Sequence, residues 1–282
     1  MTSLTIAAHS SNRPAARPGR GVALRRTIRS EFTKIRSVRS PYWTLFVLVL
    51  ASVAWCVAYC LGTVHSWPTM SAPDRASFDG AQDSVLGLAL LGQLVIVVLG
   101  ALMITSEYST GMIRTSLTVM PRRGTLYAAK AAVFAAVSLV VSFATSFGSY
   151  FLGRTLLSST HVSMSLSQPG VLRSVVVAAL YVEVCGLFAV GVGALVRSTA
   201  GALTLAFAFL MLLPQLLRAL PDFLHHALMR WVPGGDALNV MTSTKGGPMQ
   251  YMFSAWGELA VFAGYAAILL VLGAVQFSRR DA

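Results

Sequence analysis

Six long apolar stretches, separated by polar segments, set the pattern of the chain. A helix needs roughly 20 mostly apolar residues to cross a bilayer, and each stretch is close to that length. We therefore predict six membrane-spanning helices, over residues 42–64, 85–105, 131–152, 174–196, 200–217 and 255–277. The segments between them are too short for a separate soluble domain. Residues 22–282 are expected to form a single all-α integral membrane domain.

The composition supports a membrane protein. Hydrophobic residues make up 55% of the 282 residues and charged residues 11%, whereas soluble domains carry about 25% charged residues. The three cysteines do not indicate a disulfide framework, since Cys56 and Cys60 share one apolar stretch and Cys185 lies in another. The five histidines are scattered and lack the spacing of metal ligands. We therefore expect neither a metal nor another cofactor, and cysteines that act as small apolar fillers.

The distribution of the cations predicts the orientation. Lys and Arg number 22 against 10 Asp and Glu, which gives a net charge of +12. An even number of spans places both termini on one side, and sixteen of the cations fall on that side against six on the other. By the positive-inside rule, both termini are cytoplasmic and the loops at 65–84, 153–173 and 218–254 lie outside. A basic excess on so apolar a chain favours anionic lipids over nucleic acid as partners.

The segment before the first span has two parts. Residues 1–21 are rich in Ser, Pro, Gly and Arg and are expected to be disordered. From residue 22 onward, apolar residues recur at helical spacing and cations fill the other faces, which predicts an amphipathic helix in the inner headgroup layer. Its cations are Arg25, Arg26, Arg29, Lys34, Arg36 and Arg39. This helix either fixes the topology alone or also braces the transmembrane domain as an elbow.

The segment after the second span is also amphipathic. Its apolar stripe consists of Met112, Ile113, Leu117 and Met120. The other positions are mostly Ser, Thr and Arg, which predicts a short helix whose apolar face needs the membrane surface or a cytosolic protein as partner. Glu107, at its start, can pair with a cation further along the segment. The candidate cations are Arg114, Arg122 and Lys130.

The loop between the fifth and sixth spans is the longest of the three outer loops. Proline and glycine punctuate it near residues 221, 233–235 and 246–248. Two apolar segments, 223–231 and 249–253, lie between these breaks. They predict one or two short helices that either dip back into the membrane or cap the spans.

Three short motifs resemble the permease subunits of ATP-binding-cassette (ABC) exporters of the second type, particularly those of actinobacteria. They are Ser-Glu-Phe-Thr-Lys-Ile-Arg-Ser at 30–37 with Tyr42-Trp43, Glu-Tyr-Ser-Thr-Gly-Met-Ile-Arg-Thr at 107–115, and Pro-Arg-Arg at 121–123 with Lys130. The resemblance covers essentially everything after residue 22. It implies a bacterial cell membrane as location, and a coupling helix after the second span that docks on an ATPase subunit. By the same resemblance, the residues at this contact are Glu107, Tyr108, Gly111, Met112, Arg114, Arg122 and Arg123.

The chain carries no G-x-x-x-x-G-K-[S/T] loop to hold the phosphates of ATP. The resemblance therefore implies a transport subunit rather than an enzyme, driven by two copies of a separate ABC ATPase. It also implies a second permease, as a homodimer or a heterodimer. Closure of the ATPases on ATP would tilt the permeases as rigid bodies and open the cavity between them outward. The expected substrate is hydrophobic or amphiphilic.

Three polar residues inside the predicted spans are candidates for the transport pathway: Glu183, Gln93 and Gln215. An ionised carboxylate is costly in the bilayer, so Glu183 is expected to face the bundle interior or a water-filled cavity, or to be protonated. It either contacts a substrate or a proton, or locks helices together through a hydrogen bond to a residue such as Gln93, Tyr150 or Gln215. Pro214 is expected to kink the fifth span.

Two other functions stay open. A secondary transporter is expected to show inverted repeats and paired broken helices, but only the fifth stretch contains a proline and the second has no equivalent break. A non-transport membrane immunity or interaction protein is the other alternative. An intramembrane enzyme is disfavoured, since no span offers a Ser/His pair, paired Asp residues or an HExxH motif. The amphipathic loop with Glu107 and Gly111 favours the exporter permease.

Overall fold

The computed structural model describes residues 39–109, 123–160, 162, 164–245 and 252–279. Every regular element among them is helical, and none of these residues forms a strand. The predicted disordered arm and the predicted amphipathic helix lie outside the described residues, except for Arg39, which is the first residue of the first described helix. Residues 110–122 of the predicted coupling loop also lie outside them.

Six helices are long and apolar enough to cross a membrane, which confirms the predicted number. The elements that form these spans are, in chain order, α2 (Arg39–Ser66), α4 (Gly80–Gly87) with η2 (Leu88–Gly92) and α5 (Gln93–Ser109), α7 (Arg123–Leu156), α8 (Val171–Val196), α9 (Thr199–Phe207) with η4 (Ala208–Leu212) and α10 (Leu213–Arg218), and α13 (Ala255–Arg279). The short connecting elements are η1 (Trp67–Thr69), α3 (Ala72–Ser77), η3 (Leu157–Thr160), α11 (Asp222–Met229) and α12 (Asp236–Thr242).

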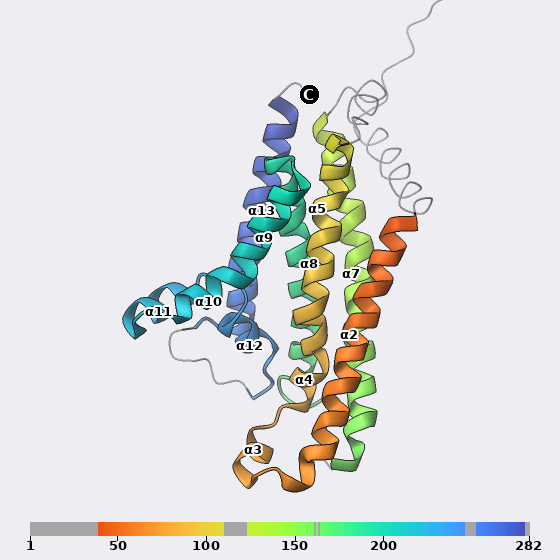
Figure 1. Ribbon diagram of the computed structural model, residues 1–282, viewed down its shortest axis with the longest axis vertical. Coiled ribbons are helices and arrows are strands. Elements are labelled where there is room, and N and C mark those ends of the chain that lie inside the picture. The colour runs from red at the N-terminus through yellow and green to blue at the C-terminus, as the bar shows by residue number, and fades with distance from the viewer. Residues whose placement is uncertain (1–38, 110–122, 161, 163, 246–251, 280–282) are drawn as a thin grey trace, which may run out of the picture.

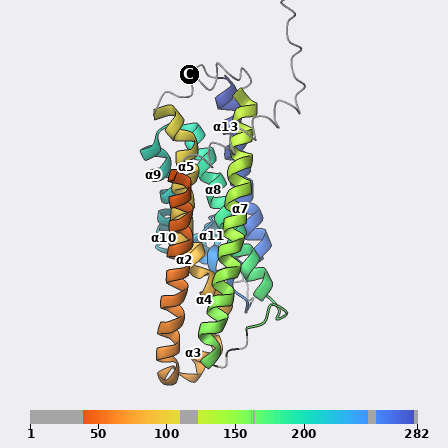
Figure 2. The same ribbon diagram turned by 90° about the vertical axis from the view of Figure 1, so that its right-hand side faces the viewer.

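The helix α8 is the centre of the bundle. It packs against α5, α7 and α13, while α2 lies against α7 and α4 (Figures 1 and 2). Of the most apolar 18-residue stretch of α8, 83% is buried, against 28% for the first, fifth and sixth spans. A helix that is apolar on all sides is stable only inside a protein or a membrane, and α8 is enclosed by protein. The fifth span leans away from the other helices from α9 to α10, where α11 follows it (Figure 1).

Two glycines let α5 and α8 approach closely. A Cβ atom added to Gly100 of α5 would overlap the carbonyl oxygen of Gly186 on α8. A Cβ atom on Gly186 would lie 2.7 Å from the ring of Phe134 on α7. Small residues permit this kind of backbone contact between membrane helices. The contact around Gly186 therefore fixes three helices relative to one another.

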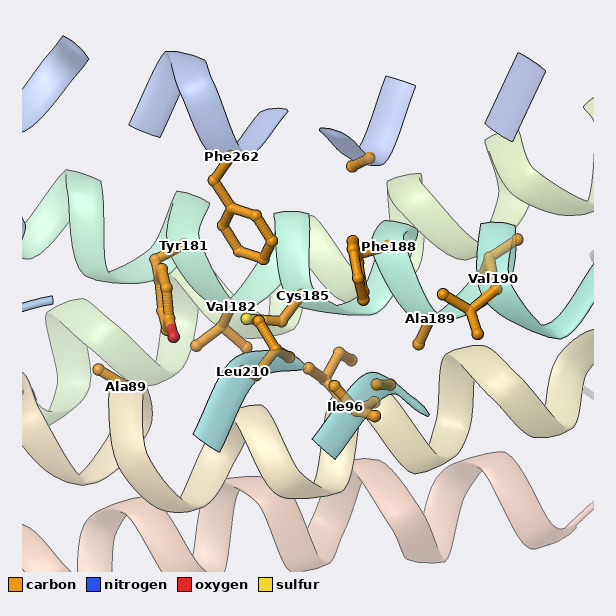
Figure 3. Close-up of a cluster of buried hydrophobic side chains, with 14 of the residues drawn as sticks. Ala89, Ile96, Tyr181, Val182, Cys185, Phe188, Ala189, Val190, Leu210 and Phe262 are labelled. Atoms are coloured by element: carbon orange, nitrogen blue, oxygen red, sulfur yellow. The ribbon is translucent and has the colours of Figure 1, made fainter. Parts of the chain in front are cut away.

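An apolar cluster surrounds the middle of α8 (Figure 3). Phe262 of α13 lies between Tyr181 and Phe188 of α8, with ring centroids 5.6 and 5.9 Å away. Ile96 of α5 and Leu210 of the fifth span close the cluster. All three cysteines of the chain are free and buried, which agrees with the prediction that they form no disulfide framework. The Cys56 thiol also donates to the Ser149 carbonyl of α7 at 3.3 Å.

Two spans, the second and the third, begin at least five residues earlier than predicted. The second begins at Gly80 because the carboxylate of Asp79 caps the helix and accepts a hydrogen bond from the Gln82 amide at 3.1 Å. The third belongs to α7, which begins at Arg123. The prediction that Lys130 lies in the preceding loop is therefore wrong, since Lys130 is inside this helix and buried. A hydropathy scan ends a predicted span at a cation. A packed helix can continue past a lysine, because the apolar stem of its side chain can be buried.

The second and fifth spans each contain a π-helical turn, η2 and η4 respectively. The prediction that the second span has no counterpart to the break in the fifth is therefore wrong. A π turn widens the helix by one residue and needs neither proline nor glycine, so composition gives no signal for it. Such turns are frequent at functional sites.

The loop between α11 and α12 fills the break in the fifth span. Pro214, in the first turn of α10, has no N–H to donate to the carbonyl of Leu210. Gly234 packs against this carbonyl, because a Cβ atom there would lie only 2.6 Å from the Leu210 oxygen. Its φ of +95° also favours glycine. The helix α11 covers most of the first predicted segment, 223–231, and projects sideways from α10 (Figure 1). The helix α12 lies outside both predicted segments, and residues 249–251 of the second segment are outside the described residues.

Candidate functional site

The predicted ATPase-coupling loop lies at the end of the bundle where α5 ends and α7 begins. Gly111, Met112, Arg114 and Arg122 lie outside the described residues. Glu107 is in the last turns of α5 and Arg123 is the first residue of α7. The structure describes one side chain of this predicted contact in full, that of Tyr108.

The guanidinium of Arg197 lies over the face of the Tyr108 ring. The Cζ atom of Arg197 lies 5.2 Å from the centroid of the Tyr108 ring, which is the geometry of a cation–π contact. Arg197 follows α8 directly and adopts a left-handed backbone with φ of +58°, so that its own N–H caps α8 by donating to the Gly193 carbonyl. One Nη atom of the same guanidinium lies 3.5 Å from the carbonyl oxygen of Gln276 near the end of α13.

Two further contacts lie among the neighbouring ends of α5, α8, α9 and α13. The hydroxyl of Thr199, the first residue of α9, donates to the Thr105 hydroxyl of α5 at 2.8 Å. The side-chain amide of Gln276 donates to the carbonyl of Leu195 on α8 at 3.2 Å. We call the set Thr105, Tyr108, Arg197, Thr199 and Gln276 the Arg197 junction. It connects the base of the predicted coupling loop to the fourth, fifth and sixth spans.

Sequence reasoning missed the Arg197 junction, because it treated Arg197 only as one of the cations on the cytoplasmic side. A local signal was present. Arg197-Ser198-Thr199 is a short polar interruption between two apolar stretches, and the Ser198 hydroxyl accepts a hydrogen bond from the Gly201 amide at 3.4 Å as the N-cap of α9.

Glu183 is buried in α8 and is held by α7. The Ser138 hydroxyl lies 2.6 Å from Glu183 Oε2 and 2.7 Å from the Phe134 carbonyl oxygen. A hydroxyl carries one hydrogen, so both contacts are satisfied together when Glu183 is a neutral acid that donates to Ser138. Glu183 Oε1 is buried and has no hydrogen-bond partner among the described residues. Ser138 was not among the partners that the sequence suggested.

The other two pathway candidates have separate partners. Gln93 is buried, and its Oε1 accepts a hydrogen bond from the Tyr181 hydroxyl at 2.7 Å, which joins α5 to α8. Gln215 is exposed, and its Oε1 lies 3.5 Å from Nη1 of Arg218. The structure therefore does not bring Glu183, Gln93 and Gln215 together into one polar site.

An apolar groove opens between α8, the fifth span and α13. Its volume is about 740 Å³, and its lining is aliphatic and aromatic apart from the hydroxyl of Tyr265. Phe188 of α8 stacks on Phe209 of η4 with centroids 5.1 Å apart, and Phe209 meets Tyr265 edge-on at 5.8 Å. Ligand pockets have volumes of roughly 300–1,000 Å³, so the groove is large enough for the apolar part of a ligand.

A charged cluster holds α10, α11 and α12 together beside this groove. Nη2 of Arg218 lies 2.6 Å from Asp236 Oδ1, and Nε2 of His225 lies 3.4 Å from Asp236 Oδ2. The other ring nitrogen of His225 lies 3.2 Å from the Leu217 carbonyl oxygen. The Tyr265 hydroxyl donates to the Trp231 carbonyl at 2.9 Å, which ties the connecting loop to α13. These contacts fix the short helices on the end of the fifth span.

The comparison with known families agrees with the arrangement of the spans. The sequence model of the ABC-2 family transporter proteins matches residues 27–214, which is two thirds of the chain and includes the first five spans as far as Pro214. No curated protein matches the chain. Because one family covers most of a six-span membrane protein, the chain belongs to the ABC-2 transporter family, as one of its membrane-spanning permeases.

Proposed function

We propose that the chain is the permease subunit of an ABC exporter in a bacterial cell membrane. A second permease copy completes the pathway, two copies of a separate ABC ATPase drive it, and the substrate is hydrophobic or amphiphilic. The observation that carries this proposal is the family match over 27–214, which spans the whole predicted coupling loop and the helices on either side. The ATPase is a separate polypeptide because the chain has no phosphate-binding loop.

The proposed orientation follows the cations. Sixteen of the 22 lie on the side of the termini, which is therefore the cytoplasmic side. The Arg197 junction then lies at the cytoplasmic end, beside the loop that docks on the ATPase. The basic segment over 25–39 lies against the anionic lipids of the inner leaflet.

The Arg197 junction is the proposed route by which ATPase movement reaches the spans. A shift of the coupling loop moves Tyr108, and the stacked guanidinium moves with the ring. Arg197 begins the turn into α9, so the displacement is applied to the start of the fifth span. The contact with Gln276 applies it to α13 as well. Rigid helices pass such shifts on as tilts, and the fifth and sixth spans are the least enclosed of the four spans that meet there.

The apolar groove is the proposed surface for the apolar part of the substrate. It lies between the fourth, fifth and sixth spans, which the Arg197 junction connects, so a tilt of the fifth span changes its width. Glu183 is not among its lining residues. We therefore assign Glu183 to a lock between α7 and α8 rather than to the substrate.

One observation favours a second candidate, a secondary transporter. The π turns η2 and η4 occupy the second and fifth spans, which are matching positions in two halves of three spans each. Paired interruptions of this kind are typical of secondary transporters. Both turns keep the helix continuous, however, and do not leave an unwound segment between half-helices.

The first test is purification of the tagged full chain from its native host in a mild detergent. We expect an ABC ATPase to co-purify in stoichiometric amount. Glu107→Ala and Arg114→Ala should each lower its yield, because both remove charges from the proposed docking surface. Arg154→Ala is the matched control, since this exposed cation lies at the other end of α7. Intact chain without any ATPase, under conditions that preserve known transporter complexes, would contradict the proposal.

A second test separates docking from coupling. Arg197→Ala should leave the amount of bound ATPase unchanged but abolish the stimulation of ATP hydrolysis by transported substrate. Arg197→Lys should retain part of the stimulation, because an ammonium keeps the charge but cannot stack as a plane on Tyr108. Full stimulation in Arg197→Ala would show that the junction does not carry the movement.

A further inference from the structure

A second cavity, the end cavity, lies at the end of the bundle opposite the Arg197 junction, near α3 in Figure 1. Its volume is about 380 Å³. Three parts of the chain build it: residues of 67–81 after α2, residues 160, 162, 164, 168 and 171 at and before the start of α8, and residues 244–245 after α12. It shares no lining residue with the apolar groove.

Contacts between distant segments hold the end cavity in shape. One oxygen of Asp79 accepts a hydrogen bond from the Thr244 amide at 2.6 Å, and the other accepts one from the Gln82 amide at 3.1 Å. Gly170, with φ of +86°, lies so close to Thr244 that a Cβ atom would approach the Thr244 carbonyl oxygen to 2.5 Å. The Nζ atom of Lys245 donates to the carbonyl of Ala76. The cavity is therefore preformed by backbone contacts and does not depend on a ligand to assemble it.

The floor of the end cavity is apolar and its rim is basic. Ala81, Met164 and Val171 are buried at the floor. The rim carries two exposed cations, Arg75 and Lys245. The Lys245 ammonium lies beside the backbone of α3, where it donates to the carbonyl of Ala76, the residue that follows Arg75.

The two cations have donors to spare. A guanidinium has five N–H donors and an ammonium has three. Among the hydrogen bonds of the described residues, Arg75 donates to the Pro68 carbonyl at 3.0 Å and its guanidinium lies 5.7 Å from the Trp67 ring centroid. The one carboxylate in the lining, Asp79, already has both oxygens bonded to backbone amides. With Arg75 and Lys245 against Asp79, the described lining carries one positive charge in excess.

We propose that the end cavity binds an anionic amphiphile. A phosphate or carboxylate group lies between Arg75 and Lys245, where charge-assisted hydrogen bonds hold it. The apolar tail lies over Met164 and along the ring of Trp67. The ligand is either an anionic membrane lipid or a free amphiphile with the same head chemistry. Binding needs neither an ATPase nor transport, so its test is independent of the function proposed above.

The test uses the purified full chain in an uncharged maltoside detergent, with decyl phosphate as the probe and calorimetry as the measurement. We expect saturable binding of decyl phosphate and at least tenfold weaker binding of decanol. Arg75→Gln and Lys245→Gln should each weaken binding about tenfold, as the loss of one charged donor does. Arg154→Gln, an exposed cation outside the lining, is the matched control and should bind as the unmodified chain does.

Further variants distinguish loss of the binding site from misfolding of the protein. Arg75→Lys and Lys245→Arg keep the charge and should retain most of the affinity. Val162→Trp fills the cavity while every charge stays in place, and should abolish binding without lowering the thermal midpoint of the protein. Absence of saturable binding to the unmodified chain would overturn the proposal. So would decanol binding as tightly as decyl phosphate, or undiminished binding in the Arg75→Gln/Lys245→Gln variant.

The source of the ligand is resolved in nanodiscs. In phosphatidylglycerol discs, a membrane-lipid ligand should compete with decyl phosphate and weaken its apparent affinity at least tenfold relative to phosphatidylcholine discs. Equal affinities in both discs would identify the ligand as a free amphiphile. Either result supports an anion-selective cavity and identifies whether its ligand is a membrane lipid or a free amphiphile.

Discussion

The helix α8 and the fifth span are similarly apolar, but their surroundings in the structure differ. Their mean hydropathies are 2.3 and 2.0, and both follow a glycine or a short polar turn. Yet protein encloses most of α8, whereas the fifth span contains a π turn and a proline and borders the apolar groove. Apolarity alone therefore does not determine whether a span is enclosed by other helices or lines a groove, where it has more freedom to move.

The difference comes from the neighbours of the two helices. Glycine on α5 and α8 brings their backbones into contact, and two hydrogen bonds, Tyr181 with Gln93 and Glu183 with Ser138, tie α8 to α5 and to α7. The described polar side-chain contacts of the fifth span to other elements lie at its ends, from Thr199 at one and from Arg218 at the other. Among the described residues, its middle makes only apolar side-chain contacts, so it can bend more readily than α8 can.

The largest effect on stability is expected from Gly100→Val, which attacks the packing of α8. The new side chain would overlap a backbone carbonyl, which cannot move aside as a flexible side chain can. Overpacking costs roughly 1–3 kcal/mol, and a clash with backbone belongs at or above the top of this range. We expect loss of the monodisperse peak in size-exclusion chromatography in detergent.

The matched control for this substitution is Gly264→Val on α13, where nothing lies within 4 Å of the added Cβ atom. It should elute and melt as the unmodified chain does. Equal behaviour of the two variants would mean that the close approach of α5 and α8 is not what fixes the centre of the bundle.

A smaller effect is expected from Ser138→Ala. This change removes the hydrogen-bond partner of the buried Glu183, and an unsatisfied buried polar group costs about 1–3 kcal/mol. In Ser138→Ala/Glu183→Leu both partners are apolar, so the thermal midpoint should return towards that of the unmodified chain. If this double variant is stable but no longer transports, Glu183 belongs to the pathway and our assignment of a lock is wrong.

The smallest of the three effects is expected from Gly234→Ala on the side of the fifth span. The positive φ and the nearby Leu210 oxygen strain any side chain there, at a cost of roughly 1–2 kcal/mol. We expect faster proteolysis within 219–245, with the thermal midpoint of the bundle little changed. Gly62→Ala in α2, where no atom lies within 4 Å, is the control. A fall in the thermal midpoint as large as that of Ser138→Ala would mean that the fifth span is as tightly coupled to the core as α8.

The spans could be predicted because the length of an apolar run is a local property. Their ends could not, because side chains outside the runs decide them. Asp79 extends the second span by capping it, and the third span accommodates Lys130 in a buried position. The π turn over 88–92 has no signature in composition and was missed for that reason.

The candidate site shows the same division. Tyr108 follows from a short motif, but the partners around it come from residues near 105, 197 and 276, which only the folded bundle brings together. Ser138 was within the predicted third span. Its contact with Glu183 depends on how α7 is rotated about its own axis against α8, which a single sequence does not specify.

The lengths of the helices have a consequence for the surrounding lipid. The 34 residues of α7 make a rod about 51 Å long, whereas the 20 residues of the fifth span make one of about 30 Å, close to the thickness of a hydrocarbon core. Bilayers adapt to such differences by thickening or thinning locally at a modest cost. From these lengths, we expect α7 to extend through the headgroup layers on both sides, whereas the fifth span ends close to the boundaries of the hydrocarbon core.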